Sequence, residues 1–123
     1  MSGILHDQVS QDSPGVQLTY LLLNEAIQKK VTRLTVVPQE NRITLLHDDV
    51  EQRQHPPRRL LSQFTILFGQ LAIKARCQPP ILATFNQVKT PHGIRWDISL
   101  NTGSCEQLKQ ELNDLFDRTF YKS

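Results

Sequence analysis

One helix followed by two strands, within residues 21–49, constrains the fold of this chain more than any other segment. Ser13 suits the cap at the start of the helix, and Pro14 suits its first position, where no backbone N–H is needed. Apolar residues then recur at helical spacing at Val16, Tyr20, Leu23 and Ile27. This spacing predicts a helix over residues 14–30, with two lysines in its last turn, where the negative end of the helix dipole lies.

Two strands are predicted directly after this helix. Residues 33–37 alternate and are partly β-branched, and residues 42–46 form a second such run. Residues 38–41 between them are typical of a turn, so the two runs predict a hairpin. The aspartates at residues 48–49 indicate a further turn, after which residues 50–54 predict a short third strand.

A central helix is predicted after a proline-containing break at residues 55–57. The segment 58–74 carries a wide apolar stripe, which is typical of a helix buried on one side. The stripe is made of Leu60, Leu61, Phe64, Leu67, Phe68 and Leu71. We expect this helix to be the most buried one.

A second hairpin is predicted beyond the prolines at residues 78–80. Residues 81–88 and 94–100 form two strand-like runs, and residues 90–93 form the turn between them. In the latter run one set of side chains should point to a covered face. That set is Ile94, Trp96, Ile98 and Leu100.

A last amphipathic helix completes the predicted fold. Ser104 and Gln107 form a capping box, and the helix should run to about Phe120. Its apolar side is formed by Leu108, Leu112, Leu115 and Phe116. The order α-β-β-β-α-β-β-α predicts an α+β fold, with one mostly antiparallel sheet packed by helices in two layers. We expect one domain over residues 13–123, preceded by a flexible tail at residues 1–12.

Composition narrows the class of protein. The 123 residues are 38% hydrophobic and 21% charged, as in ordinary globular proteins. A net charge of +2 gives no strong signal for binding nucleic acid. No apolar run approaches the roughly 20 residues that span a bilayer, and residues 1–11 lack the features of a signal peptide. We therefore expect a cytoplasmic protein in which Cys77 and Cys105 are free thiols.

Three short motifs resemble those of a known family. Residues 30–38 read Lys-Val-Thr-Arg-Leu-Thr-Val-Val-Pro, residues 46–49 read Leu-His-Asp-Asp, and residues 97–102 read Asp-Ile-Ser-Leu-Asn-Thr. The domain that precedes the motor in type II secretion and type IV pilus ATPases has G-A-S-D-I-H-x-E-P, R-x-D-G and D-L-R-V-S-T at these places. Residues 21–106 resemble that domain. The resemblance implies a PAS-like two-layer domain that stands without its motor.

Catalytic chemistry is not expected. The sequence contains no G-x-x-x-x-G-K-[ST] loop to hold phosphates, and Leu46 and Ser99 stand where the family has arginines that face the nucleotide. His47-Asp48-Asp49 has the groups of a metal or acid–base site, but adjacent residues of an extended chain alternate faces. We interpret these three residues as a solvated turn. We therefore expect no catalytic residue, no cofactor-binding residue and no metal ligand.

The leading hypothesis is a non-catalytic cytoplasmic adaptor or regulatory protein. The resemblance implies a pilus or secretion motor ATPase, or another component of such a machine, as its partner. Three arginines beside the Pro56-Pro57 turn, Arg53, Arg58 and Arg59, are the candidate contact residues. Arginine forks suit bidentate contacts, and a rigid turn loses little entropy on binding.

Two other classes remain open. The predicted element order is also similar to that of dimeric chaperones of secreted effector proteins, although those are usually acidic and this chain has a pI near 8.7. A small-ligand sensor is the third class, because a PAS-like layout can enclose a pocket. The sequence leaves the oligomeric state and the strand order undetermined.

Overall fold

The computed structural model describes residues 14–77, 82–101 and 103–121. Three sequence predictions lie outside the described residues: the tail at residues 1–12, the Ser13 cap and the proline break at residues 78–80. The predicted free thiol of Cys77 lies outside the described side chains.

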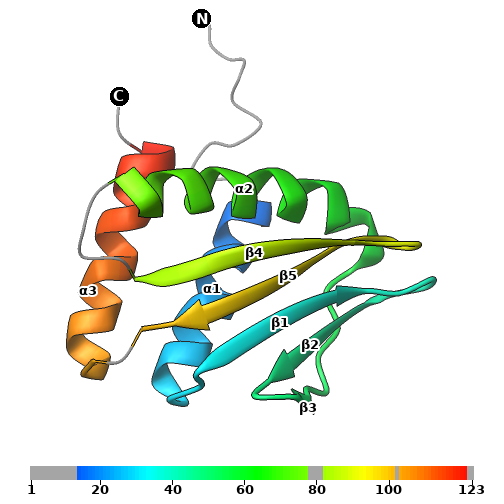
Figure 1. Cartoon of the computed structure of the whole chain (residues 1–123), viewed down its shortest axis with the longest axis horizontal. Helices are drawn as coiled ribbons and strands as arrows, with labels where there is room; N and C mark the ends of the chain where they lie inside the picture. The colour runs from blue at the N-terminus through cyan, green and yellow to red at the C-terminus, as the bar shows by residue number, and fades with distance from the viewer. Residues whose placement is uncertain (1–13, 78–81, 102, 122–123) are drawn as a thin grey trace, which may run out of the picture.

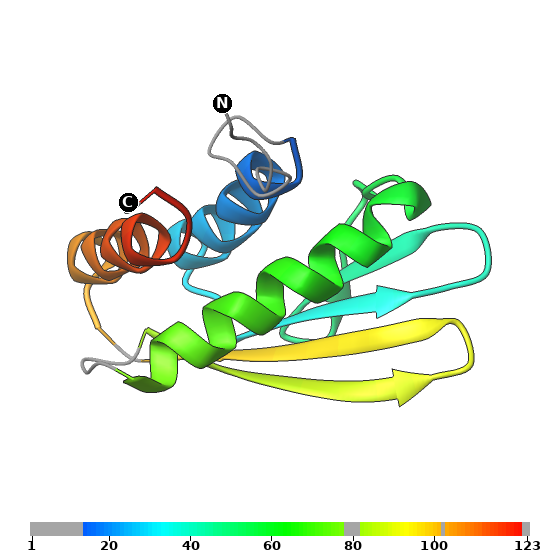
Figure 2. The ribbon, with the colours of Figure 1, turned by 90° about the horizontal axis from the view of Figure 1, so that it is seen from above.

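The described chain forms two layers, with three α-helices on one side of a five-stranded antiparallel sheet (Figures 1 and 2). The strands, in the spatial order β3-β2-β1-β5-β4, are β1 (Arg33–Pro38), β2 (Ile43–His47), β3 (Val50–Glu51), β4 (Ala83–Thr90) and β5 (Gly93–Leu100). The helices are α1 (Pro14–Gln28), α2 (Leu61–Cys77) and α3 (Cys105–Phe116). The predicted α+β fold and its order α-β-β-β-α-β-β-α are confirmed.

Helix α1 ends in a well-formed C-terminal cap. The N–H of Lys30 donates to the Ile27 carbonyl at 3.0 Å, and the N–H of Val31 donates to the Ala26 carbonyl at 2.9 Å. These are the two hydrogen bonds of a Schellman motif, which needs a left-handed residue after the helix. Lys30 is that residue, with a φ of 59°. The chain then turns directly into β1, with Val31 buried.

The two hairpins of the sheet meet where β1 pairs with β5. In this ladder Leu34 lies opposite Ile98, and Val36 lies opposite Trp96. All four side chains are buried on the helix side of the sheet. Across β1, the strand β2 adds its own core residues, since Leu45 lies opposite Val36. The predicted covered face of β5 is therefore confirmed, with Ile94 packed at its margin.

Helix α2 packs diagonally across the sheet (Figure 2). Between this helix and the sheet lies a cluster of aromatic rings. A single 3₁₀ turn, η2 (Arg58–Leu60), precedes it. The Phe68 ring lies 5.7 Å from the Trp96 ring and 6.2 Å from the Phe85 ring, centroid to centroid. Five of the six residues of the predicted stripe, Leu61, Phe64, Leu67, Phe68 and Leu71, are buried at the centre of the core, whereas Leu60 lies in η2 and is partly buried.

Helix α3 packs on α1 rather than across the sheet. Its N-cap is Ser104, whose Oγ accepts a hydrogen bond from the Gln107 N–H at 3.1 Å. Phe116 meets Tyr20 edge-on, at 5.3 Å between ring centroids, and the Tyr20 hydroxyl donates to Asn113 Oδ1 at 2.6 Å. The capping box prediction is thus right for the serine. A π-helical turn, η3 (Asp117–Tyr121), continues the helix.

All five strands differ from the sequence prediction at one end or both, and β1 and β5 differ by one residue each. Strand β3 is two residues long instead of five, because its second half carries no apolar side chain to hold it against the sheet. Strand β2 extends one residue further than predicted, to His47. Strand β4 begins at Ala83 instead of residue 81 and ends at Thr90. Its last residues are held by backbone pairing with β5, as between Thr90 and Gly93, and not by burial.

We predict that Leu67→Ala or Phe68→Ala lowers the free energy of unfolding by about 2–5 kcal/mol, the usual cost of truncating a large buried side chain. Urea denaturation of the two variants measures this loss. Leu21→Ala is the matched control, because the Leu21 side chain is 57% exposed. The position of α2 in the core would be contradicted if both core variants lost less than about 1 kcal/mol.

Candidate functional site

The sheet has one face turned away from the three helices, which we call the open face (Figure 2). The pairing register assigns side chains to it, since residues directly opposite one another share a face. Thr35 of β1 lies between Leu46 of β2 and Asp97 of β5, and Arg33 lies opposite Ser99. The open face comprises Arg33, Thr35, Val37, Thr44, Leu46, Glu51, Thr84, Asn86, Val88, Thr90, Arg95, Asp97 and Ser99.

Charges on and beside the open face are paired. The Arg95 guanidinium lies 3.1 Å from the Asp97 carboxylate, two residues along the same strand. The Arg33 guanidinium lies 2.6 Å from the Asp49 carboxylate in the β2–β3 turn. The same face carries Thr35 and Thr44, which are buried, the partly exposed Leu46, and the exposed Val88 on the outer strand β4. This mixture of apolar, hydroxyl and internally neutralised groups suits contact with another protein better than contact with a highly charged ligand.

The β2–β3 turn is held to the start of β1 by one carboxylate. Asp48 and Asp49 both have positive φ, of 51° and 72°, as a two-residue type I′ hairpin turn requires. Asp48 Oδ1 accepts from the Thr32 N–H at 3.0 Å, from the Thr32 hydroxyl at 2.5 Å and from the Arg33 N–H at 2.9 Å. The Thr32 hydroxyl, followed by the Arg33 N–H, lowers the pKa of the Asp48 carboxyl. Asp48 is therefore a structural residue.

The interpretation of His47-Asp48-Asp49 as a solvated turn is right for the aspartates and wrong for the histidine. Both aspartates are exposed, but the His47 side chain is only 8% exposed and lies on the helix side of β2. The strand continues one residue further than the sequence prediction, which turns His47 inward. Burial, the largest effect, lowers its pKa below the usual value of 6.5. The three side chains do not form a metal or acid–base site.

The three predicted contact arginines have different environments. Arg58 Nε donates to the Gln39 carbonyl at 2.8 Å, and Arg58 Nη2 donates to the His92 carbonyl at 2.8 Å. Gln39 follows β1 and His92 lies in the β4–β5 turn, so Arg58 fastens both hairpins to the start of α2. Arg53 and Arg59 are exposed. The sequence did not indicate the structural role of Arg58, because the two carbonyls are brought to it only by the fold.

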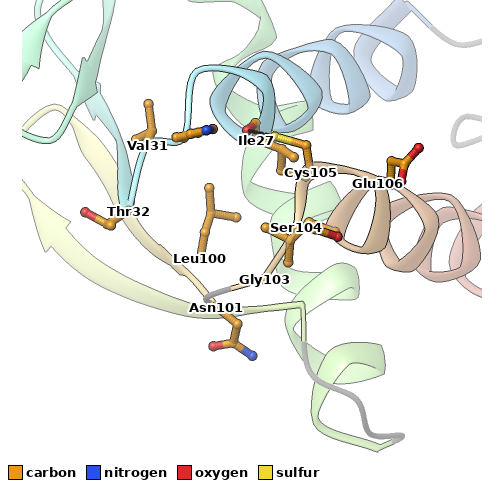
Figure 3. Close-up of a pocket in the computed structure, with 11 residues that line it drawn as sticks. Ile27, Val31, Thr32, Leu100, Asn101, Gly103, Ser104, Cys105 and Glu106 are labelled. Atoms are coloured by element: carbon orange, nitrogen blue, oxygen red, sulfur yellow. Dashed lines mark hydrogen bonds between the residues drawn. The ribbon is translucent and has the colours of Figure 1, made fainter.

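A surface pocket of about 600 Å³ lies where α1 ends and α3 begins (Figure 3). Its lining combines apolar side chains, such as Ile27 and Leu100, with the polar groups of Ser104 and Glu106. The Cys105 thiol donates to the Ile27 carbonyl at 3.5 Å. Anion binding at the start of α3 is disfavoured, because Ser104 caps the helix and Glu106 carries negative charge in its first turn.

Metal chemistry finds no support in the described residues, which contain no group of three His, Cys, Asp or Glu side chains arranged to hold an ion. The described helices also fall short of the length and apolar character needed to cross a membrane. No protein-family model matches the chain, and no curated protein matches it. The site is therefore defined by its geometry alone.

We predict that Arg58→Ala lowers the free energy of unfolding by about 1–3 kcal/mol, because two hydrogen bonds from a charged donor are lost. Arg59→Ala, at the adjacent exposed position, should stay within about 0.5 kcal/mol of the wild type. Chemical denaturation of both variants measures the difference. Equal stability of the two variants would contradict the structural role of Arg58.

We predict that His47 makes the fold less stable in mild acid. The buried imidazole takes up a proton less readily than it does in the unfolded chain, so stability falls as the pH drops below about 6.5 and is unaffected by His47 well above that value. Melting temperatures of the wild type and His47→Leu, recorded near pH 7.5 and near pH 5.5, test this. The melting temperature of the wild type should fall more between the higher and the lower pH than that of the variant does. An equal loss would show that His47 titrates normally.

Proposed function

We propose that this protein is a non-catalytic adaptor domain that binds a type IV pilus or secretion ATPase, or a component of the same machine, through the open face of its sheet. Two observations support the proposal: the resemblance of three short motifs to those of the family, and the positions that the residues of these motifs take in the fold. The burial of aromatic rings between α2 and the sheet favours protein contact over the alternative of an enclosed ligand cavity of the PAS type.

The observation that carries the proposal concerns backbone conformation. Three described residues other than glycine have positive φ: Lys30, Asp48 and Asp49. Lys30 and Asp49 stand where the family motifs G-A-S-D-I-H-x-E-P and R-x-D-G have glycine. Left-handed backbone favours glycine, and a lysine there costs energy. At both positions where the family motifs have glycine, this chain therefore has the left-handed backbone that glycine adopts most easily, although its residues there are lysine and aspartate. This agreement is independent of the apolar pattern.

The placement of the two motif arginines supports the choice of surface. Their positions are occupied by Leu46 and Ser99, which lie on β2 and β5 and both belong to the open face. The resemblance implies that the family's arginines at these two positions face the nucleotide in the intact motors. This chain offers a partly buried leucine and a short hydroxyl there, and the two arginines of the open face, Arg33 and Arg95, are already paired with Asp49 and Asp97. We therefore assign the open face to a protein partner and propose no role in ATP chemistry.

The exposed arginines extend this surface in the proposal. Arg53 follows β3 and Arg59 lies in η2, and both remain candidate contacts. Arg58 is left unchanged in any test of binding, because its side chain holds the two hairpins. A variant at Arg58 would confuse lost binding with lost structure.

We predict that a tagged copy, recovered from the cells that produce it, captures a pilus or secretion motor subunit detectable by mass spectrometry. Leu46→Glu with Ser99→Glu should reduce this capture by about tenfold or more, since a central contact commonly contributes over about 1.4 kcal/mol. Arg53→Glu with Arg59→Glu should reduce it less, as expected for residues at the rim of an interface.

Matched controls lie on the helix side. Leu21→Glu replaces an exposed leucine of α1, and Ser62→Glu replaces an exposed serine of α2. Both should retain capture, and thermal melts of all variants verify folding. Capture of one unrelated effector protein in place of a motor subunit would overturn the proposal in favour of a secretion chaperone. Undiminished capture by the folded Leu46/Ser99 double variant would remove the open face as the contact surface.

A further inference from the structure

A second surface, separate from the open face, lies along the groove between α2 and β4. The groove has a volume of about 700 Å³. Ile66, Gly69, Gln70 and Ile73 form its α2 wall, and Phe85 and Trp96 contribute to its floor. Figure 1 shows β4 at the margin of the sheet, below α2. The groove therefore lies where the two layers of the fold end.

The wall of the groove exposes apolar surface. Ile66 is 52% exposed and Ile73 is 61% exposed, on the same side of α2 because they are seven residues apart. Between them, Gly69 has open space around it, since an added Cβ would meet no atom within 4 Å. Two isoleucines flanking a residue without a side chain form a surface that another helix can approach closely.

Two polar groups at the groove have no hydrogen-bond partner within the described chain. Trp96 is only 2% exposed, yet its Nε1–H is unpaired. The Oε1 atom of Gln70, on the wall, is also buried and unpaired. Buried polar groups are nearly always hydrogen-bonded in native proteins. The groove is thus bordered by a buried donor and a buried acceptor that the described chain does not satisfy.

Among the residues that the structure describes, strand β4 has a neighbour on one side only, which is β5, and its other edge runs beside the groove. The strand is eight residues long. Its single charged residue is Lys89. Long edge strands with few charges readily pair with another strand, and natural proteins normally cover or interrupt them.

We propose that the occupant is a second copy of this chain, which pairs its β4 antiparallel with this β4 and packs its α2 against this α2 in a two-fold symmetric dimer. A two-fold interface needs a surface that complements itself. On α2, a two-fold axis between Gly69 and Gln70 places Ile66 opposite Ile73 of the second copy. On β4, a two-fold axis at Asn86 or Gln87 pairs the strand antiparallel with β4 of the second copy.

The charges and amides of the two surfaces fit this arrangement. With the β4 axis at Asn86 or Gln87, Lys89 lies opposite Ala83 or Phe85 of the second copy, so like charges do not meet. The net charge of +2 adds little repulsion between copies. Gln87 is exposed and lines the groove.

Sedimentation velocity on the full chain over a range of concentrations tests the dimer. We expect the wild type to sediment as two chains, and Ile66→Glu or Ile73→Glu to sediment as one chain while remaining folded by circular dichroism. Leu21→Glu and Val50→Glu are matched controls, because both change an exposed apolar residue outside the groove, and both should remain dimeric.

The one tryptophan of the sequence gives a second readout. Its single indole N–H signal in a proton–nitrogen NMR spectrum should shift and exchange faster with solvent when Ile73→Glu separates the copies. A wild type that stays monomeric at all concentrations overturns the proposal. This holds even if a different protein proves to occupy the groove. A dimer that Ile66→Glu and Ile73→Glu leave intact, or that Leu21→Glu disrupts equally, also overturns it.

Discussion

The pairing of β1 with β5 is the interaction on which the rest of the structure depends. Each strand belongs to a separate hairpin, and the ladder between them makes one sheet of the two. It also sets Val36 and Trp96 side by side beneath α2, so that the aromatic cluster around Phe68 has a continuous floor. Arg58 fastens the turn ends of both hairpins. The open face, on the reverse of the same ladder, has its register set by the same pairing.

Much of the fold could be predicted from the sequence because its elements have distinct apolar periods. The stripe on α2 and the alternation on β5 each match one face of one element, and burial follows them closely. The start of β4 was harder to predict. Its burial alternates only as far as Phe85, and backbone pairing with β5 holds the remaining residues, so the apolar pattern placed the strand two residues early.

The candidate sites show a different limit. Leu46 and Ser99 were singled out by motif, and the register then placed them on a common face, which the motifs alone did not indicate. Arg58 was predicted to be a contact residue because a sequence shows charge but not the carbonyl oxygens that satisfy it. The groove beside β4 could not be predicted from the sequence either. Trp96 and Phe85 fit a core pattern, and only the packing reveals that Trp96 Nε1 lacks a partner.

The separation of the two hairpins by α2 has a consequence for the order in which the chain can fold. Hairpin β1–β2 and its helix α1 are local and can form as soon as they are synthesised, but the neighbour of β1 is about sixty residues further along. Closing so long a loop has an entropic cost that is recovered only when the distant strand pairs. Until then Leu34, Val36 and Ile43 have no covering layer. A nascent chain is thus exposed to aggregation until β5 has been made and has paired with β1.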